Sequence, residues 1–191
     1  AVETPRAAEL LSLLGRDPAS DAPCLGASAT GGGQALADPA ARKAVVKCQK
    51  GFAKAGMGYA SQEQKLLQKC AATVATCLQQ KASDPACLAK ATKTCGKIAL
   101  KLTAAEAKVG TTIAKSCGAA GVAVAGVVAN EGLGFGVQEP TCTALGVGSL
   151  ATLGDVATCS VRLHACRAEQ LLENQTPRLR ELLELGATPL D

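Results

Sequence analysis

The cysteines constrain this chain more than any other feature, because six of its ten cysteines are arranged as mirror images about one point in the sequence. Residues that face each other in an antiparallel helical hairpin have a nearly constant sum of residue numbers. The three cysteine pairs have this property, which predicts a long hairpin over residues 38–117 that turns near Ala82. Its two arms would be linked by three nested disulfides: Cys77–Cys87, Cys70–Cys95 and Cys48–Cys117.

Helix signals agree with this hairpin. Asp38-Pro39 and Asp84-Pro85 each place a capping side chain before a proline at the first helical position. Ser61-x-x-Gln64 and Thr103-x-x-Glu106 have the pattern of capping boxes, and Gly56–Gly58 and Gly110 would bend the two arms. We therefore expect either one long hairpin or two stacked helix pairs. The expected helices are 39–55, 62–82, 85–102 and 104–117.

A second pairing competes with the nested set. Cys48 and Cys70 are also symmetric about Tyr59, so a turn over residues 56–60 would join them to each other. We favour the nested set because a single axis then accounts for six cysteines.

The remaining cysteines lie outside the hairpin, at positions 24, 142, 159 and 166. Cys159 and Cys166 share one face of an expected helix over 156–174, two turns or about 10 Å apart, which is too far for a disulfide. Each must therefore pair with Cys24 or Cys142. We favour Cys142–Cys159 and Cys24–Cys166.

The composition indicates a disulfide framework in an oxidising compartment. Aromatic residues make up 2% of the chain and tryptophan is absent. A core of Ala, Val and Leu buries little apolar area per residue, so at about 25 cal/mol per Å² it gains little stability from the hydrophobic effect. The cysteine number is even and no Cys-x-x-Cys pair occurs, which is atypical of zinc and iron–sulfur sites. The start, Ala1–Pro5, resembles a mature end left by signal-peptide removal. We expect a secreted protein, extracellular or at the cell surface.

The expected fold is mainly α: a disulfide-linked long antiparallel helical hairpin or a small helical bundle, with Gly-rich loops and amphipathic terminal helices. Residues 1–37 would form an N-terminal docking helix (5–14) and a loop. The hairpin (38–117) is followed by a Gly/Ala-rich connection (118–154) and by C-terminal helices (155–191) over 156–174 and 177–185. The apolar stretch Gly118–Ala129 is too short to span a bilayer. Its small residues suit a tight interface or strand pairing, or alternatively a buried connection within one subunit.

The two ends of the chain repeat each other. Thr4–Leu13 and Thr176–Leu185 are identical at seven of ten positions, and both have the pattern of a short amphipathic helix. Two related ends of this kind would dock head-to-tail on neighbouring subunits, and such heterologous contacts form rings or filaments. Alternatively, both helices pack on their own subunit. The candidate assembly residues are Leu10, Leu11, Leu13, Leu182, Leu183 and Leu185.

No residue cluster has the pattern of a catalytic, metal or cofactor site. His164 is the only histidine and lies between two cysteines that the disulfide framework uses. No Gly-x-Ser-x-Gly elbow occurs, and Gly31–Gly33 lacks the Lys-Ser/Thr of a phosphate loop. The lysines between Lys43 and Lys115 indicate a solvated helix face, since the aromatic residues that stack on nucleic-acid bases are missing. We expect no enzyme, no cofactor and no nucleic-acid partner.

Several short motifs resemble exported, cysteine-rich α-helical bacterial proteins to which no function is attached. They are Lys47-Cys48-Gln49, Gln68-Lys69-Cys70, Gly132-Leu133-Gly134-Phe135 and Pro177-Arg178-x-x-Glu181-Leu182-Leu183. The resemblance covers residues 43–186. It implies export and a helical fold, and brings no activity or binding residues.

Together these features predict a secreted structural protein, a self-assembling subunit of an extracellular filament, sheath or surface layer, whose partner is a copy of itself. The alternative is an extracellular binding module for a small apolar ligand or lipid. Closely packed, Ala-lined helices leave little cavity, which counts against that alternative. An enzyme that relies on His164 is the third and least supported hypothesis.

Overall fold

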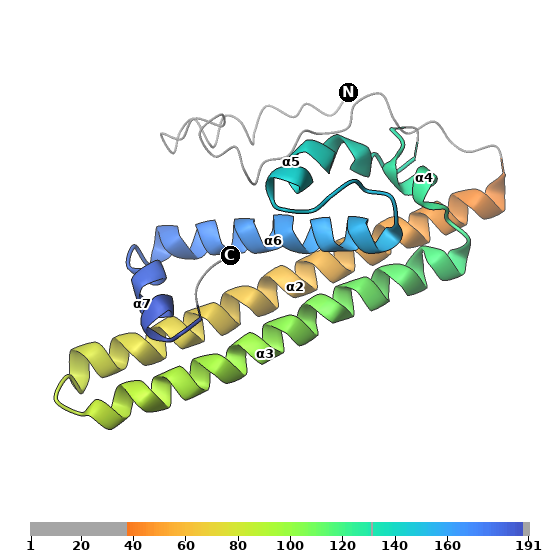
Figure 1. Ribbon diagram of the computed structural model, residues 1–191. Coiled ribbons are helices and arrows are strands. Elements are labelled where there is room, and N and C mark those ends of the chain that lie inside the picture. The colour runs from red at the N-terminus through yellow and green to blue at the C-terminus, as the bar shows by residue number, and fades with distance from the viewer. Residues whose placement is uncertain (1–37, 131, 189–191) are drawn as a thin grey trace.

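Two long antiparallel helices form the body of the protein (Figure 1). The computed structural model describes residues 38–130 and 132–188, and all regular structure within these ranges is helical. Helix α2 (Pro39–Gln80) runs the full length of the hairpin, and α3 (Pro85–Ser116) returns beside it. The mainly α fold and the hairpin are therefore as predicted. The expected helix 5–14 lies outside the described residues.

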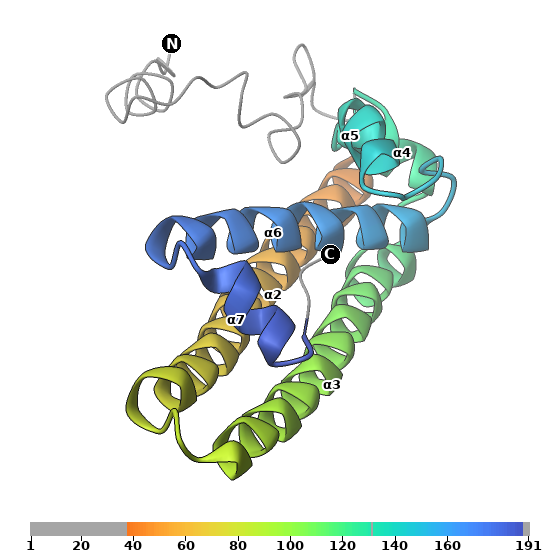
Figure 2. The same ribbon diagram turned by 60° about the vertical axis from the view of Figure 1, so that its left-hand side comes forward.

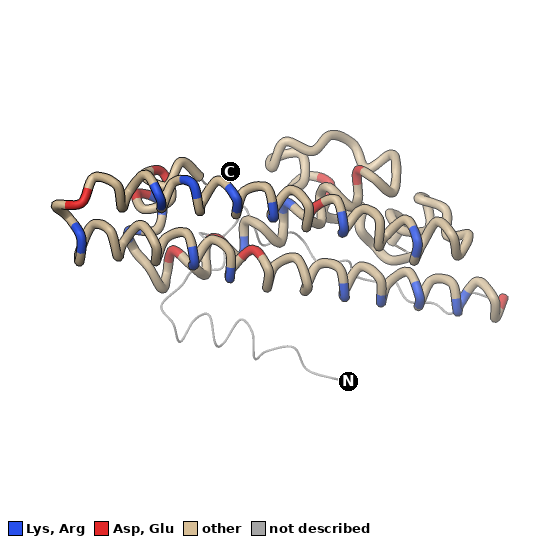
Figure 3. The backbone as a smooth tube through the Cα atoms, turned by 90° about the horizontal axis from the view of Figure 1, so that it is seen from below, with Lys and Arg blue, Asp and Glu red and all other residues tan. Residues whose placement is uncertain are grey.

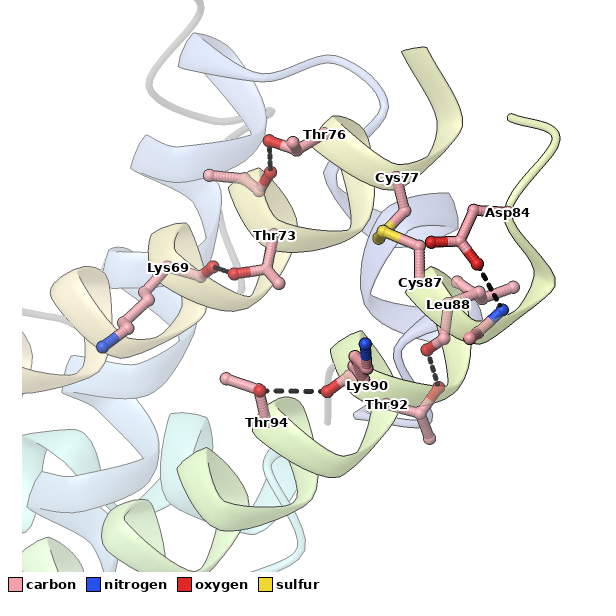
Figure 4. Close-up of a disulfide and its surroundings, with 12 residues drawn as sticks. Lys69, Thr73, Thr76, Cys77, Asp84, Cys87, Leu88, Lys90, Thr92 and Thr94 are labelled. Carbon is pink, nitrogen blue, oxygen red and sulfur yellow. Dashed lines mark hydrogen bonds between the residues drawn. A yellow bond between two sulfur atoms is a disulfide. The ribbon is translucent and has the colours of Figure 1, made fainter. Parts of the chain in front are cut away.

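Capping aspartates set the starts of both long helices, as predicted. The Asp38 carboxylate accepts hydrogen bonds from the backbone N–H groups of Ala40 and Ala41, at 3.1 and 3.0 Å. The Asp84 carboxylate accepts one from Ala86 at 2.9 Å, immediately after the turn (Figure 4). In both helices a proline occupies the first turn, where its missing N–H has no intrahelical partner to lose.

The expected breaks within the two arms are wrong, because α2 and α3 are continuous over 42 and 32 residues. The apparent capping residues Ser61 and Thr103 lie inside helices. The Thr103 hydroxyl donates to the carbonyl of Ala99 at 3.3 Å, as an interior threonine does. Interior N–H groups already bond the preceding turn, so they need no cap. An interior glycine costs only about 1 kcal/mol, too little to end a helix that packs along its length.

The disulfides of the hairpin are those of the nested set, and the Cys48–Cys70 alternative is wrong. The paired Cα atoms are 4.4 Å apart in Cys48–Cys117, 5.1 Å in Cys70–Cys95 and 5.6 Å in Cys77–Cys87. The last bond lies next to the turn (Figure 4). The hairpin is thus cross-linked at one end, in its middle and at its turn.

A fourth disulfide, Cys142–Cys159, ties the connecting segment to the C-terminal helix, as predicted, with Cα atoms 5.3 Å apart. Cys166 is also disulfide-bonded. Its predicted partner Cys24 lies outside the described residues.

The Gly/Ala-rich connection is more ordered than the loop that the sequence predicts. It forms four short helical elements packed over one end of the hairpin (Figure 1). Val127 and Cys142 are completely buried, and the ring of Phe135 lies 4.4 Å from that of Phe52 on α2. Within Gly118–Ala129, which the structure shows as helical turns rather than a strand, Val122 and Val127 are buried against the hairpin cluster, whereas half of the residues are exposed. The elements are η1 (Gly118–Ala120), α4 (Val124–Val128), η2 (Phe135–Gln138) and α5 (Glu139–Ala144).

Helix α6 (Leu153–Gln175) lies across the hairpin, and α7 (Leu179–Leu185) folds back onto it (Figure 2). Helix α6 begins earlier than predicted because Thr152 and Asp155 form a capping box. The Thr152 hydroxyl accepts from the Asp155 N–H at 3.1 Å, and the Asp155 carboxylate accepts from the Thr152 N–H at 2.8 Å. Pro177 does not begin α7. A turn precedes that helix instead, with the Leu179 N–H bonded to the Thr176 carbonyl.

The buried side chains form two clusters along the hairpin. One surrounds the Cys48–Cys117 disulfide and holds the connecting segment and the first half of α6. The other surrounds the Cys70–Cys95 disulfide and holds the end of α6 and the buried leucines of α7. Because both clusters consist mostly of small aliphatic side chains and half-cystines, the disulfides are part of the core as well as cross-links.

Candidate functional site

Two of the three C-terminal assembly leucines pack within their own chain. Leu183 is completely buried and Leu182 is 6% exposed, both in the cluster around the Cys70–Cys95 disulfide, whereas Leu185 is 40% exposed. Gly186, just after α7, packs directly against the Cys70–Cys95 disulfide: a Cβ added to it would be about 3 Å from both sulfur atoms. At the C-terminal end, therefore, the helix packs on its own subunit, which is the alternative to docking on a neighbour. Leu10, Leu11 and Leu13 lie outside the described residues.

His164 is a packing residue at the crossing of α6 and α2. A Cβ added to Gly56 would overlap its imidazole ring, so the two helices approach closely there. Burial lowers the pKa of His164 below its ordinary value, and the nearby Arg167 lowers it further. Within the described ranges, no group of three His, Cys, Asp or Glu side chains is placed to hold a metal ion.

A polar cluster lies where α2, α3 and α6 meet. The buried Tyr59 hydroxyl donates to a carboxylate oxygen of Glu106 at 3.5 Å, and the carboxyl of Glu63, 3% exposed, lies one turn further along α2. Burial raises the pKa of Tyr59 far above its ordinary value, and Glu63, Glu106 and Glu169 raise it further. The phenol therefore stays protonated and acts as a hydrogen-bond donor. Its hydrogen bond to Glu106 links α2 to α3.

A groove of about 570 Å³ runs between α2 and α3. Its floor consists of small or apolar residues: Gly51, Ala55, Gly58, Ala105 and Val109. Four exposed lysines stand around it, three from α2 and one from α3: Lys47, Lys50, Lys54 and Lys108. The lining is completed by Tyr59, Gln62, Thr112 and Ser116, so it contains no acidic side chain.

The positive charge continues beyond the groove toward the start of α2. A shallower hollow of about 460 Å³ shares Lys47 and Lys50 with it and adds Arg42, Lys43 and the half-exposed Val46. In the part of the chain that the structure describes, none of the four groove lysines forms an ion pair. The groove therefore presents uncompensated positive charge.

The groove is the centre of a wider charge separation. Residues 38–117 contain fourteen of the twenty Lys and Arg residues but only four of the sixteen Asp and Glu residues. The hairpin therefore has a net charge of +10 and the rest of the chain −6. Lys and Arg recur along both long helices (Figure 3). On the C-terminal side, by contrast, arginines are paired: Arg178 with Glu181 at 2.6 Å and Arg180 with Glu173 at 2.9 Å.

The sequence contained a signal for this groove that the prediction of a solvated helix face did not use. Lys47, Lys50 and Lys54 recur at three and four residues, which places them on one helix face. Gly51 and Ala55 each follow one of these lysines by one position, and Gly58 lies three residues after Ala55. A cationic stripe beside a stripe of small residues predicts a charged edge along a hollow.

No family model, curated protein or solved structure matches this chain. Among the helices that the structure describes, none combines the length and apolarity needed to span a membrane. The oxidised cysteines are compatible with an extracellular location.

Proposed function

We propose that this protein is an exported structural subunit that assembles with copies of itself into an extracellular filament, sheath or surface layer, without catalysing a reaction. The disulfides support this role, because cross-links at three heights keep a long two-helix rod straight and resistant to unfolding. Disulfides also persist in the oxidising conditions outside the cell.

The observation that carries the proposal is the charge separation between the hairpin and the rest of the chain. The hairpin has a net charge of +10, and it would attract the remaining parts of a neighbouring chain, whose residues together sum to −6 in the sequence. Such a contact joins two different surfaces, so each copy keeps one free surface of each kind and assembly continues. Leu182 and Leu183 are used within their own chain. The N-terminal leucines, Leu10, Leu11 and Leu13, are therefore the proposed apolar anchors.

The test is the salt dependence of assembly by the native, disulfide-bonded protein. Charge attraction reaches about 30 Å at 0.01 M salt and about 3 Å at 1 M. Negative-stain microscopy and light scattering should therefore detect polymers at the low salt concentration and their loss at the high one. Nuclease treatment beforehand excludes a nucleic-acid bridge. Compact monomers at both salt concentrations would contradict the proposal. Polymers that persist equally at both concentrations would contradict its electrostatic basis.

A second function, an extracellular binding module for a small apolar ligand or lipid, is favoured by the groove. Ala-lined helices were expected to pack too closely to leave such a space. However, the glycines and alanines of α2 and α3 leave about 570 Å³ between the lysine side chains.

A further inference from the structure

We propose that the groove between α2 and α3 binds a single-chain anionic amphiphile, with its acidic head among the lysines and its hydrocarbon chain along the floor. This inference rests on the ligand-binding function proposed above and is independent of assembly. The ligand class follows from two properties of the lining: the charge of its rim, and the size and polarity of its floor.

The rim fits a single anionic group. Lys50 and Lys54 reach the groove from α2 and Lys108 reaches it from α3, so an anion between the helices meets ammonium groups from both sides. No carboxylate in the lining competes for them. Hydrogen bonds to charged groups are stronger than those between neutral groups. The rim therefore favours an acidic head over a neutral one of the same size.

The floor fits a hydrocarbon chain. The lining of the groove on α2 extends from Lys47 to Gln62, which corresponds to about 22 Å at 1.5 Å per residue, and the floor residues Gly51, Ala55 and Gly58 lie within it. The groove is thus long for its volume, a shape that suits one extended chain better than a ring system. Each methylene removed from water adds to the affinity, so the chain supplies binding free energy that a free anion lacks.

The binding experiment compares three probes on the full disulfide-bonded chain: decanoate, decanol and acetate. In calorimetric titrations decanoate should bind at least about tenfold more tightly than decanol, which has the same chain and no charge. Acetate, which has the charge and no chain, should show no binding.

Two variants test the site, each with a matched control. Gly58→Leu places a side chain on the groove floor, where an added Cβ meets nothing within 4 Å. It should weaken decanoate binding at least about tenfold, whereas Gly96→Leu, at an equally open glycine outside the groove, should not. Lys50→Gln with Lys108→Gln should remove the preference for decanoate over decanol. The same double change at Lys97 and Lys101, outside the groove, should preserve it. Circular dichroism and disulfide mapping check that each variant folds.

The outcomes separate this inference from the function on which it rests. Equal binding of decanoate and decanol, unaffected by the lysine variants, would overturn the anionic preference and leave ligand binding standing. Failure of both probes to bind would overturn both. Acetate binding as tight as decanoate binding would show a site for free anions. Binding to phosphatidylglycerol vesicles without binding of monomeric decanoate would show a membrane surface instead. Each of these last two results contradicts the proposal.

Discussion

At the scale of single residues, small side chains decide how closely the helices approach. Gly56 admits the imidazole of His164 and Gly51 admits Ser116, because a Cβ at either glycine would overlap the neighbouring side chain. Gly58, two residues after Gly56 on α2, faces open space. Glycine thus permits tight packing at two positions and leaves a hollow at the third. The sequence does not distinguish these two roles; the three-dimensional arrangement does.

His164 should make stability depend on pH. Its pKa is lowered in the folded protein, so the unfolded chain binds a proton more readily. The stability contributed by the neutral, buried imidazole is fully present above the unfolded pKa of about 6.5. It is lost progressively as the pH falls toward the pKa of the folded protein. The free energy of unfolding should therefore decrease between about pH 7 and pH 5.5. Urea denaturation at several pH values measures it.

The matched control is His164→Gln, which cannot titrate in this range. Since the chain has one histidine, the variant should lose most of the pH dependence between these values. An equally steep dependence in the variant would assign the effect to other groups.

At the scale of elements, the mirror arrangement of the cysteines predicted the hairpin and its disulfides because a covalent bond tolerates little error in register. Asp38 and Asp84 likewise predicted helix starts, since capping depends on neighbouring residues alone. Apparent signals at Ser61 and Thr103 failed because a helix that is already formed overrides them. The short helices after residue 117 escaped prediction because packing over the hairpin end, rather than local sequence, orders them.

The candidate site was less predictable than the fold. The spacing of Lys47, Lys50 and Lys54 places them on one face, but the groove also requires Lys108 from the other arm. Similarly, the leucine stripe of residues 179–185 predicts an amphipathic helix but does not identify the surface on which that helix packs. The structure places Leu182 and Leu183 against the Cys70–Cys95 disulfide of their own chain.

The disulfides should differ in how much they stabilise the hairpin. Cys48–Cys117 joins residues 69 apart in sequence, whereas Cys77–Cys87 joins residues 10 apart. Replacing both cysteines by alanine should cost about 4 kcal/mol for the first bond and about 3 kcal/mol for the second, because a longer closed loop restricts the unfolded chain more. Guanidinium denaturation of the two double variants measures the order. A larger loss at Cys77–Cys87 would show that strain or local packing dominates.

At the scale of the whole molecule, the hairpin is a self-contained rod to which other segments are attached. Its three disulfides lie within residues 48–117, and α6 and α7 pack on it through both core clusters. Removal of a segment that precedes the hairpin leaves these disulfides and the packing of α6 and α7 in place, so the rod should remain folded. Loss of assembly can then be separated from loss of structure, which makes the self-assembly proposal testable by truncation.

Deletion of residues 1–16 is that truncation. The segment carries Leu10, Leu11 and Leu13, the proposed apolar anchors, in a sequence that repeats Thr176–Leu185. A helix of this length is marginal in water when isolated, since helices below about 12–15 residues need a packing partner. The truncated protein should keep its helical circular dichroism and the disulfides of the hairpin, yet form no polymers in negative stain at low salt. If it unfolds, the segment belongs to the core of its own subunit; if it still assembles, the contact between copies lies elsewhere. Either result contradicts the N-terminal leucines as anchors between subunits.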